Sequence, residues 1–569
     1  MNLFSHCILT ASDERQAQAF RALLDRRIEH GLYPREIAFH VYADPPGRVG
    51  SGGGTLWALH RLYQDLGHDP TLSPVDAPTV LVVHGAGESR RLPIYAPEGK
   101  LFAPVPAASS SVIPPVVLDL QLALFLRFPW LPGQVIVSSG DVVVDFDTDQ
   151  IQEFVSPITG FGVSSTLEMG SRHGVYRFSA DLSGVEDYYQ KANVGFLRQN
   201  ARIERTGGCA VDTGIVVMQP AYVSRLFALA REERHQGQTL IERVASGESR
   251  FELYLEQLYA SLPALDTDEY KSRIQGKSTL STRMNEAFFE YLHSMPLGAH
   301  LAGSSSFIHV GNMAELPEAT RRIAAAGIGP FYHFSDSAEL PPIWQEGVTF
   351  ACLGEKSPQV SAASYAYVEN CGHALTIHFA GSGTVAGLES LAAPLGVEDG
   401  FCVDIRRVED RDYAAVYHAA DSFRPSRPST LRFCGMPLYE WLGARGLSGS
   451  DIGLEPEVET DLYDLPLFCD DVTPEGIRAY MAVPKDVIAW KKKFLPAERR
   501  SLRELNAASD AVERDKKRSE RRSACLRRHV LDGSGWHTVF ADDLVRSAQD
   551  ADRDRLGEIA AATTDPILA

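Results

Sequence analysis

The stretch VLVVHGAGESRRLPIYAPEGKLFAPVP, residues 80–106, decides the fold of this chain. It opens with an apolar run, breaks into glycines, and then presents two adjacent arginines, two spaced prolines and Lys100. An apolar run of this kind is typical of a buried strand in an α/β sheet, and a glycine-rich turn at its carboxyl end is where such sheets bind ligands. We therefore search for a site at this end of the strand.

The segments before and after this stretch alternate between strand-like and helix-like patterns. HCILTASD (residues 6–13) predicts a strand, and DERQAQAFRALLDRRIEHG (13–31) predicts a helix that stops at Gly31. IAFHVYAD predicts the next strand, RVGSGGGT a glycine loop, and LWALHRLYQDL a helix. Further strands are expected in GQVIVSSGDVVV and VDTGIVVM. This alternation predicts an α/β layer architecture with a mainly parallel sheet.

Length and composition indicate a soluble globular chain of two to four domains. The chain has 569 residues, of which 44% are hydrophobic and 23% charged. No stretch approaches the roughly 18 apolar residues that span a bilayer. The N-terminus lacks the pattern of a secretory signal, so we expect a cytoplasmic protein that does not act at a membrane. Eight scattered cysteines without a CxxC pair are expected to be reduced, packed thiols.

The texture of the sequence changes twice along the chain. Residues 1–330 carry the alternating pattern and form the expected catalytic domain. Residues 331–425 contain short apolar runs separated by small residues, which suggests short strands stacked as in a β-solenoid. Past a predicted linker at 425–430, residues 426–569 return to helical patterns and predict a mainly helical C-terminal region.

Charge is unevenly spread. The whole chain has a formal charge of −19, yet residues 491–528 contain 14 basic and 6 acidic residues. A basic run can bind nucleic acid. The mixed signs and helical spacing favour a solvated helix face instead, so we do not expect a nucleic acid partner.

Two glycine-rich segments follow strand-like runs, GSGGGT at 50–55 and HGAGES at 84–89. Glycine lets successive backbone amides approach an anion, since no Cβ intervenes. A P-loop is excluded, because the GKS at 276–278 has Lys271 where the first glycine belongs. A dinucleotide fingerprint also fails, because Arg90 replaces the third glycine of GAGESR.

What remains is a glycine loop with fixed positive charge beside it. Arg91 and Lys100 suit a triphosphate, whose transfer chemistry depends on positioning and electrostatics. Magnesium is then expected, with Asp141 at a strand end and Asp212 in VDTG as candidate ligands, although a strand-end aspartate is often a turn or helix cap. A carboxylate at Glu88 would repel phosphate unless it points away or pairs with Arg90.

The sequence resembles the GDP-L-fucose pyrophosphorylase (fucose-1-phosphate guanylyltransferase) family, including the guanylyltransferase half of bifunctional fucokinase enzymes. The resemblance rests on pieces that occur in order over about 440 residues. These are LTASDERQ, HVYADPPGRVGSGGGTLWAL, HGAGESRRLPIYAPEGKLFAPVP, LDLQLAL, SSGDV, RHGVYRF, YYQKAN, VDTGIVVM, FIHVGN, GFCVDI and GMPLYEWLGARGLS.

The resemblance implies a Rossmann-like nucleotidyltransferase domain, a β-helix-like region and a helical C-terminus. It also implies the reaction, in which a sugar 1-phosphate oxygen attacks the α-phosphate of GTP and releases pyrophosphate, with Mg²⁺ as cofactor. The site residues that it implies are Arg91 and Lys100 (catalytic), Gly52, Gly53, Gly54, Thr55, Gly85, Gly87 and Arg90 (nucleotide), Lys191 and His173 (sugar phosphate), and Asp141 and Asp212 (metal).

Three positions depart from the family pattern, namely Glu88, Leu101 and Ala192. Two alternatives therefore stay open, a nucleotidyltransferase that uses another sugar 1-phosphate and a non-catalytic homologue that binds a sugar nucleotide. For His173 a structural role also stays open. We expect no fused sugar-kinase domain after the helical region, so that another enzyme supplies the sugar 1-phosphate.

Overall fold

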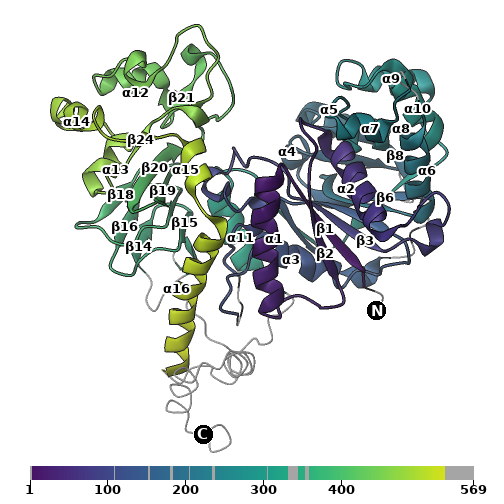
Figure 1. Cartoon of the computed structure of the whole chain (residues 1–569), viewed down its shortest axis with the longest axis horizontal. Coiled ribbons are helices and arrows are strands. Elements are labelled where there is room, and N and C mark those ends of the chain that lie inside the picture. Colours follow the sequence, from purple (N-terminus) through teal and green to yellow (C-terminus); the bar gives the residue numbers. More distant parts are fainter. Residues whose placement is uncertain are drawn as a thin grey trace, which may run out of the picture. The chain divides into compact units, whose positions relative to one another are not determined.

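The computed structural model describes residues 3–531 apart from 108, 110, 152–153, 155, 180–183, 204–205, 234–236, 304, 331–343, 346 and 353–357. The chain divides into two compact units (Figure 1). Unit 1 comprises Met1–Gly87 and Gln121–Phe307, and unit 2 comprises Glu88–Leu120 and Ile308–Ala569. Residues 80–106, called the signature stretch below, therefore pass from unit 1 to unit 2 directly after Gly87.

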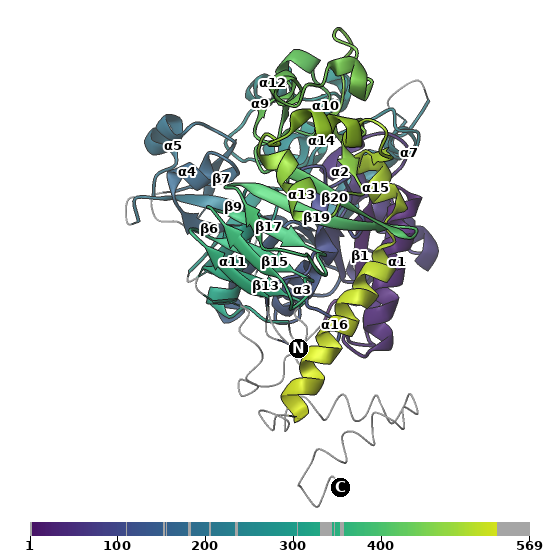
Figure 2. The same cartoon turned by 90° about the vertical axis from the view of Figure 1, so that its left-hand side faces the viewer.

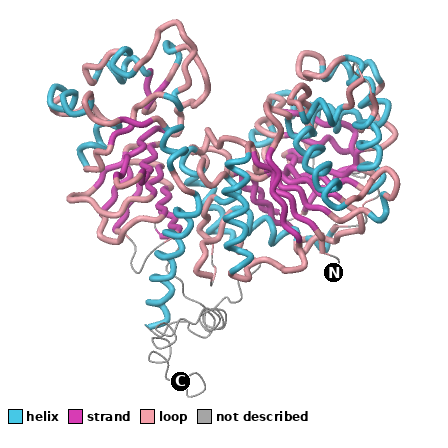
Figure 3. Tube along the Cα trace, viewed as in Figure 1, coloured by secondary structure: helices cyan, strands magenta, loops and turns pink. Residues whose placement is uncertain are grey.

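Unit 1 is built on a nine-stranded mixed sheet, whose strands are magenta in Figure 3. The main strand order is β10-β6-β9-β4-β3-β1-β2, and β7 and β8 extend it beside β9. Strands β2, β1, β3 and β4 run parallel, β9 runs antiparallel to both β4 and β6, and β10 is parallel to β6. The strands are β1 (His6–Ala11), β2 (Ala38–Ala43), β3 (Val80–His84), β4 (Val135–Ser139), β6 (Ile158–Ser165), β7 (Gly174–Phe178), β8 (Val185–Gln190), β9 (Cys209–Met218) and β10 (Leu297–Ala302), with β5 (Val142–Phe146) outside this sheet.

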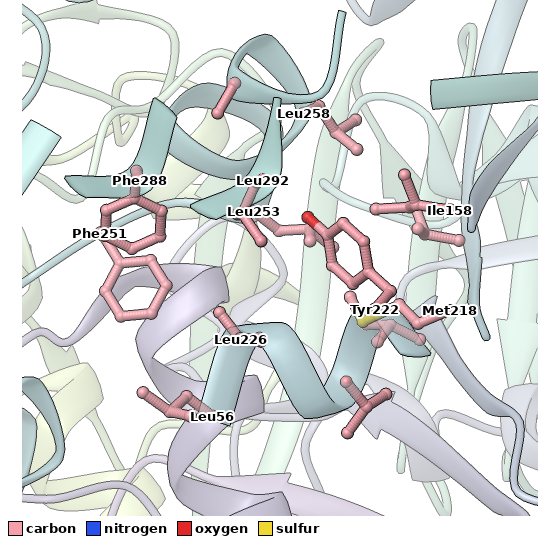
Figure 4. Packing of buried hydrophobic residues seen from close by; sticks show 14 of the residues in the cluster. Leu56, Ile158, Met218, Tyr222, Leu226, Phe251, Leu253, Leu258, Phe288 and Leu292 are labelled. Atoms are coloured by element: carbon pink, nitrogen blue, oxygen red, sulfur yellow. The ribbon is translucent and has the colours of Figure 1, made fainter. Parts of the chain in front are cut away.

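The helices of unit 1 cover an extensive apolar core. Side chains from α2, α6, α10 and the segment around residue 251 interdigitate with the strand residues Ile158 and Met218 (Figure 4). The helices are α1 (Glu14–Glu29), α2 (Gly50–Leu66), α4 (Leu167–Gly170), α5 (Val194–Asn200), α6 (Pro220–Arg231), α7 (Leu240–Ala245), α8 (Leu258–Ala260), α9 (Thr267–Ile274) and α10 (Thr282–Leu292), with short turns η1 (Pro74–Asp76), η4 (Thr148–Gln150) and η5 (Leu253–Gln257). Two further elements, α3 (Val117–Phe125) and β11 (Ser305–His309), contain the unit boundaries.

The predicted alternation of strands and helices is confirmed in this unit. The run at 80–84 is β3, whose first four residues are buried, and it lies between β1 and β4. The helix predicted for residues 13–31 is confirmed as α1, which begins after Asp13, whose side chain accepts a hydrogen bond from the amide of Gln16. The expected loop at 50–55 is wrong, because α2 already begins at Gly50.

Unit 2 contains a region in which alternate strands pair. Strands β13, β15, β17 and β19 form one parallel series, visible in Figure 2, and β14, β16 and β18 form a second. Strand β20 closes the first series antiparallel to β19. The strands are β12 (Trp344–Gln345), β13 (Val348–Ala351), β14 (Gln359–Ala362), β15 (Ala366–Glu369), β16 (Thr376–Phe379), β17 (Gly383–Ala386), β18 (Leu395–Val397), β19 (Phe401–Val408), β20 (Arg411–His418), β21 (Arg432–Phe433), β22 (Met436–Pro437), β23 (Phe468–Cys469) and β24 (Arg499–Arg500).

The remaining elements of unit 2 are mostly helical and include the second half of the signature stretch. They are η2 (Pro93–Tyr95), η3 (Lys100–Phe102), α11 (Leu316–Ala326), η6 (Pro428–Thr430), α12 (Leu438–Ala444), η7 (Gly449–Ile452), η8 (Leu462–Asp464), α13 (Pro474–Met481), α14 (Val487–Phe494), α15 (Leu502–Ala508) and α16 (Ala511–Leu531). The predicted region boundaries at 330 and 425 stay a prediction. Residues 532–569 of the predicted helical region lie outside the described residues.

Two simpler expectations can be compared with the described residues. Seven cysteines are buried free thiols, as predicted; they are Cys7, Cys209, Cys352, Cys371, Cys402, Cys434 and Cys469. None of the described helices is long and apolar enough to cross a membrane.

Candidate active site

The first half of the signature loop is anchored by the ends of β1 and α1. Strand β3 ends at His84, and the chain then leaves regular structure at Gly85. The amide of Ala86 donates to Thr10 Oγ1 at 3.3 Å, and Gln16 Nε2 donates to the carbonyl of Gly87 at 2.9 Å. Gly87 has φ of +137°, which favours glycine. The loop therefore begins in a defined conformation at the carboxyl end of the sheet.

The two glycine-rich segments meet beside His84. Thr55 Oγ1 lies 2.9 Å from His84 Nε2 and donates to the carbonyl of Ser51 at 2.8 Å. Burial lowers the pKa of His84 to about 4, so the ring is neutral at physiological pH. Since the threonine hydrogen is used on the carbonyl, Nε2 carries the hydrogen of the histidine contact. The structure thus joins the start of α2 to the residue that precedes Gly85.

The glycines at 50–54 form the first turn of α2 because of close packing with a segment about 200 residues later in the chain. The amides of Gly52 and Gly53 donate to the carbonyl of Phe251 at 3.1 and 3.2 Å, and Glu252 Oε2 accepts from the amide and hydroxyl of Ser51. A Cβ at Gly52 would lie 2.5 Å from the Phe251 ring. In this conformation these amides serve the fold, and they are not directed at a ligand.

This packing gives a testable prediction for Gly52→Ala. The added methyl group overlaps the Phe251 ring and lies 2.9 Å from Gln257 Nε2, so the variant should lose about 1–3 kcal/mol of unfolding free energy in urea. Gly443→Ala in α12 is the control, since a Cβ there meets nothing within 4 Å and should be neutral or slightly stabilising. Equal stability of the Gly52→Ala variant and the wild type would contradict the packing argument.

Glu88, which lies in the part of the loop that belongs to unit 2, pairs with two arginines. Arg90 Nε donates to Glu88 Oε2 at 2.5 Å, and Arg503 Nη1 lies 3.3 Å from Glu88 Oε1. Although burial opposes the charged form, the hydrogen bonds from these arginines hold the pKa of Glu88 below its ordinary value. Of the two arrangements that the sequence left open for Glu88, the pairing with Arg90 is therefore present.

The adjacent arginines Arg90 and Arg91 have different environments. Arg90 also forms an ion pair with the buried Asp461, and its guanidinium lies 5.4 Å from the centre of the Tyr463 ring. Arg91 is exposed, and its side chain forms no ion pair within the described part of the chain. Its carbonyl accepts from the amide of Met313 at 2.9 Å, which fixes the backbone. Arg90 is therefore engaged in structure, whereas Arg91 remains available.

Lys100 follows a buried carboxylate that the basic helix α16 holds. Glu98 is 1% exposed, and its Oε1 lies 2.5 Å from both Arg514 Nε and Arg518 Nη1. Burial works against ionisation, but these two arginines lower the pKa of Glu98 to about 2. Arg518 Nε also pairs with the buried Glu369 at 2.8 Å. The segment that presents Lys100 is thus fixed by ion pairs two residues earlier.

The expectation that the basic run is a solvated helix face is wrong for several of its arginines. Arg518 is 2% exposed, and Arg514 also donates to the carbonyl of Ile94 at 3.0 Å. Arg522 donates to the carbonyls of Ser109 and Ser111. Their partners lie in residues 94–111, some 400 positions earlier in the chain, so local charge spacing did not indicate them. In this conformation these side chains are unavailable to a nucleic acid.

We predict that Glu98→Gln destabilises the protein by about 3–5 kcal/mol at pH 7, because it leaves buried arginine charge uncompensated. The folded-state pKa of Glu98, about 2, is below its ordinary value of 4.5, so its contribution is complete above pH 4.5 and is lost as the pH falls towards 2. The stability difference between wild type and variant should shrink over that range, as measured by denaturant unfolding.

Glu389→Gln is the matched control for this measurement. Glu389 pairs with Arg521 of the same helix at 2.5 Å, but its side chain is 67% exposed. An exposed pair contributes about 0–1 kcal/mol. If both variants lost the same small amount at pH 7, the Glu98 pairs would not hold the segment.

The two candidate metal ligands differ in burial. Asp141 follows β4 and is half-buried, and its Oδ1 accepts from Ser139 Oγ at 2.8 Å. It lies at the loop edge, because the amide of Gly140 donates to the carbonyl of His84 at 3.1 Å. Asp212 in β9 is 6% exposed, and its oxygens accept from Tyr188 Oη and from the amide of Gly214. Burial raises the pKa of Asp212 to about 6.

Asp141 fits Mg²⁺ better than Asp212 does. Mg²⁺ takes one or two carboxylates and completes its octahedron with waters and phosphate oxygens, which suits a half-buried carboxylate at a loop. Asp212 is the more buried of the two, at 6% exposed, and each of its oxygens already accepts one hydrogen bond. Among the described residues no three His, Cys, Asp or Glu side chains gather into a metal site.

The predicted sugar phosphate residues lie together at the ends of paired strands. Lys191 follows β8, and its amide donates to the carbonyl of His173, the residue before β7, at 3.0 Å. Lys191 is exposed with φ of +51° and makes no side-chain interaction in the described part of the chain. The His173 ring packs edge-on against Phe307 at 5.2 Å between centroids. The backbone of an exposed lysine thus adjoins the backbone of a partly buried histidine.

One strand-end carboxylate, Asp44, was not among the predicted site residues. It directly follows β2, just as Asp141 follows β4, and it lies beside Gly54. The rule that selected Asp141 would have selected it. The motif YADPPG reads as a turn, and only the structure shows that no described residue donates a hydrogen bond to this carboxylate.

These features define a mixed α/β protein. In unit 1, glycine segments and the carboxylate of Asp141 lie at the ends of parallel strands, and unit 2 carries the exposed Arg91. The chain belongs to the fucose pyrophosphorylase family, whose domain matches residues 74–469. The match includes the signature stretch and extends to β23.

Curated relatives agree with this family at low identity. The fucose-1-phosphate guanylyltransferase of Mus musculus is 25% identical over 337 residues, covering 54% of this chain and 55% of the relative. The L-fucokinase/L-fucose-1-P guanylyltransferase of Bacteroides fragilis is 24% identical over 430 residues, covering 72% and 40%. The bifunctional fucokinase/GDP-fucose pyrophosphorylase of Arabidopsis thaliana is 26% identical over 491 residues, covering 78% and 44%. The chain spans about half the length of the curated relatives it matches.

Proposed function

We propose that this chain makes GDP-L-fucose from GTP and L-fucose 1-phosphate. A phosphate oxygen of the sugar phosphate attacks the α-phosphorus of GTP, the bond from that phosphorus to the β-phosphate oxygen breaks, and pyrophosphate leaves. The observation that carries the proposal is the family match over residues 74–469, together with the guanylyltransferase names of the relatives.

In this proposal the signature loop lets the backbone come close to the triphosphate and places positive charge beside it. Gly85 and Gly87 let the backbone come close to phosphate, and Arg91 follows four residues later with a guanidinium that is not otherwise engaged. Arg91 and Lys100 neutralise the charge that grows on the leaving pyrophosphate. Residues 52–55 support the loop through His84, and Arg90 holds Glu88 away from the phosphates.

The sugar phosphate is assigned to Lys191 and His173. The exposed ammonium group of Lys191 can neutralise the monoester, and the adjacent His173 contributes an imidazole at the same strand ends.

Magnesium is part of the same proposal. Asp141 would hold it together with water and phosphate oxygens, and the bound ion would neutralise phosphate charge and fix the geometry of the triphosphate. Asp212 is the second carboxylate proposed for the ion, and it also accepts hydrogen bonds from Tyr188 and from the turn at Gly214.

The finer fold assignments belong to the proposal as well. The parallel order of β2, β1, β3 and β4 supports a Rossmann-like domain, and the alternate pairing of β13 to β19 supports a β-solenoid in residues 331–425. Residues 426–569 are proposed as the mainly helical region. The cytoplasmic location stays a prediction.

The proposal is tested by a pyrophosphate-release screen of the purified chain with Mg²⁺. Each of the four nucleoside triphosphates is combined with β-L-fucose 1-phosphate and with other sugar 1-phosphates. We expect the highest kcat/KM for GTP with fucose 1-phosphate. Turnover only with a different sugar 1-phosphate would overturn the assignment of fucose 1-phosphate as the substrate. Nucleotide binding without turnover of any pair would favour the non-catalytic alternative.

We predict that Arg91→Ala lowers kcat by about 10²- to 10³-fold, the usual effect of removing an electrostatic group that acts in the transition state. Its melting temperature should not change, because the side chain is exposed and makes no ion pair among the described residues.

Arg90→Ala is the neighbouring comparison. It breaks the ion pair with the buried Asp461, so it should lower the melting temperature. If Arg91→Ala retained full turnover, the catalytic assignment of that arginine would be wrong.

A further inference from the structure

The carboxylate of Asp44 lies at the carboxyl end of the sheet in unit 1. It directly follows β2, and its backbone amide donates to the carbonyl of Ala11 at 2.7 Å, which extends the β1–β2 ladder by one bond. A Cβ built on Gly54 would lie 3.3 Å from Asp44 Oδ1 and 3.7 Å from His84 Cε1. The carboxylate therefore lies over the glycine backbone of α2 and near the residue that begins the signature loop.

Asp44 has no hydrogen-bond donor of its own. Among the residues that the structure describes, no amide, hydroxyl or cationic group donates to this carboxylate. The nearby donors are used elsewhere: Trp57 Nε1 donates to the carbonyl of Ala43 at 3.0 Å, and Tyr42 Oη donates to Asp65 at 2.7 Å. Burial alone raises the pKa of Asp44 to about 7. Keeping such a group half-buried is costly unless something donates to it.

Asp44 does not act as a helix cap either. Helix α2 begins at Gly50, six residues later, and its first amides are bonded to Phe251 and Glu252. A turn-forming or capping role therefore leaves the carboxylate unexplained.

We infer that Asp44 reads the base of the nucleotide by accepting hydrogen bonds from the N1–H and the 2-amino group of guanine. This inference rests on the proposed function and names the residue that selects its nucleotide. An ionised carboxylate offers two acceptors and no donor. Guanine presents two adjacent donors on its pairing edge, whereas adenine, cytosine and uracil each place an acceptor beside their donor. Gly54 lacks a side chain, so the base can approach the carboxylate.

Asp44→Asn tests this reading by changing one acceptor into a donor. Xanthine carries a carbonyl oxygen where guanine carries the 2-amino group, so the asparagine amide suits xanthine and the carboxylate suits guanine. A bidentate base contact discriminates by about 1–3 kcal/mol, or roughly 5- to 150-fold. With the sugar 1-phosphate held constant, the ratio of kcat/KM for XTP to kcat/KM for GTP should therefore rise by roughly 5- to 150-fold or more in the variant.

Equilibrium binding makes the test independent of turnover. GDP, IDP and XDP are titrated into wild-type and Asp44→Asn protein. The wild type should bind GDP more tightly than IDP, which lacks the 2-amino group, and the variant should lose that preference. Asp65→Asn on α2 is the matched control and should leave all ratios unchanged, because Asp65 accepts from Tyr42 on the exposed side of the helix. The melting temperature of Asp44→Asn should not fall, since no bond within the chain is lost.

The outcomes separate this inference from the proposed function. The base-reading role is overturned if the wild type uses GTP but Asp44→Asn lowers kcat/KM for GTP, ITP and XTP by the same factor. It is also overturned if the wild type binds GDP, IDP and XDP equally or does not bind them. If GDP binding shifts as expected but no sugar 1-phosphate is converted, the role of Asp44 stands and the proposed transferase reaction fails.

Discussion

The ion pairs of Glu98 with Arg514 and Arg518 are the constraint on which the second half of the signature stretch depends. Three buried or largely buried arginines, Arg406, Arg514 and Arg518, face three buried carboxylates, Glu98, Glu369 and Asp404, so the charges balance. Removing one partner from such a network is far more damaging than the net contribution of any single pair suggests. The same network donates to the carbonyls of Pro93 and Ile94, and it therefore fixes the backbone on both sides of the short turn that precedes Lys100.

This constraint explains why two adjacent arginines have different roles. Arg90 forms ion pairs with Glu88 and Asp461 and contacts the Tyr463 ring. The pair with Glu88 offsets the repulsion that this carboxylate would otherwise exert on phosphate. Arg91 keeps its charge available. The loop thus carries a carboxylate and still presents a positive charge at Arg91, because Glu88, Asp461 and Glu98 each have an arginine partner within the same unit.

Sequence patterns predicted what depends on neighbours along the chain. The buried run of β3 and the helix α1 follow from local order. The start of α2 was missed because glycine disfavours helices, and only Phe251 and Glu252, about 200 residues away, supply the packing and acceptors that stabilise it there. The burial of Arg518 was missed for the same reason, since its partner Glu98 lies 420 positions earlier.

The most direct test of guanylyl transfer follows the oxygen atoms of the reaction. Fucose 1-phosphate carrying ¹⁸O in its phosphate group is incubated with GTP, Mg²⁺ and the protein, and the products are analysed by mass spectrometry. Attack of the sugar phosphate on the α-phosphorus predicts GDP-fucose that retains all of the label and pyrophosphate that contains none. Label in the released pyrophosphate, or GTP breakdown without labelled GDP-fucose, would contradict the reaction proposed for this chain.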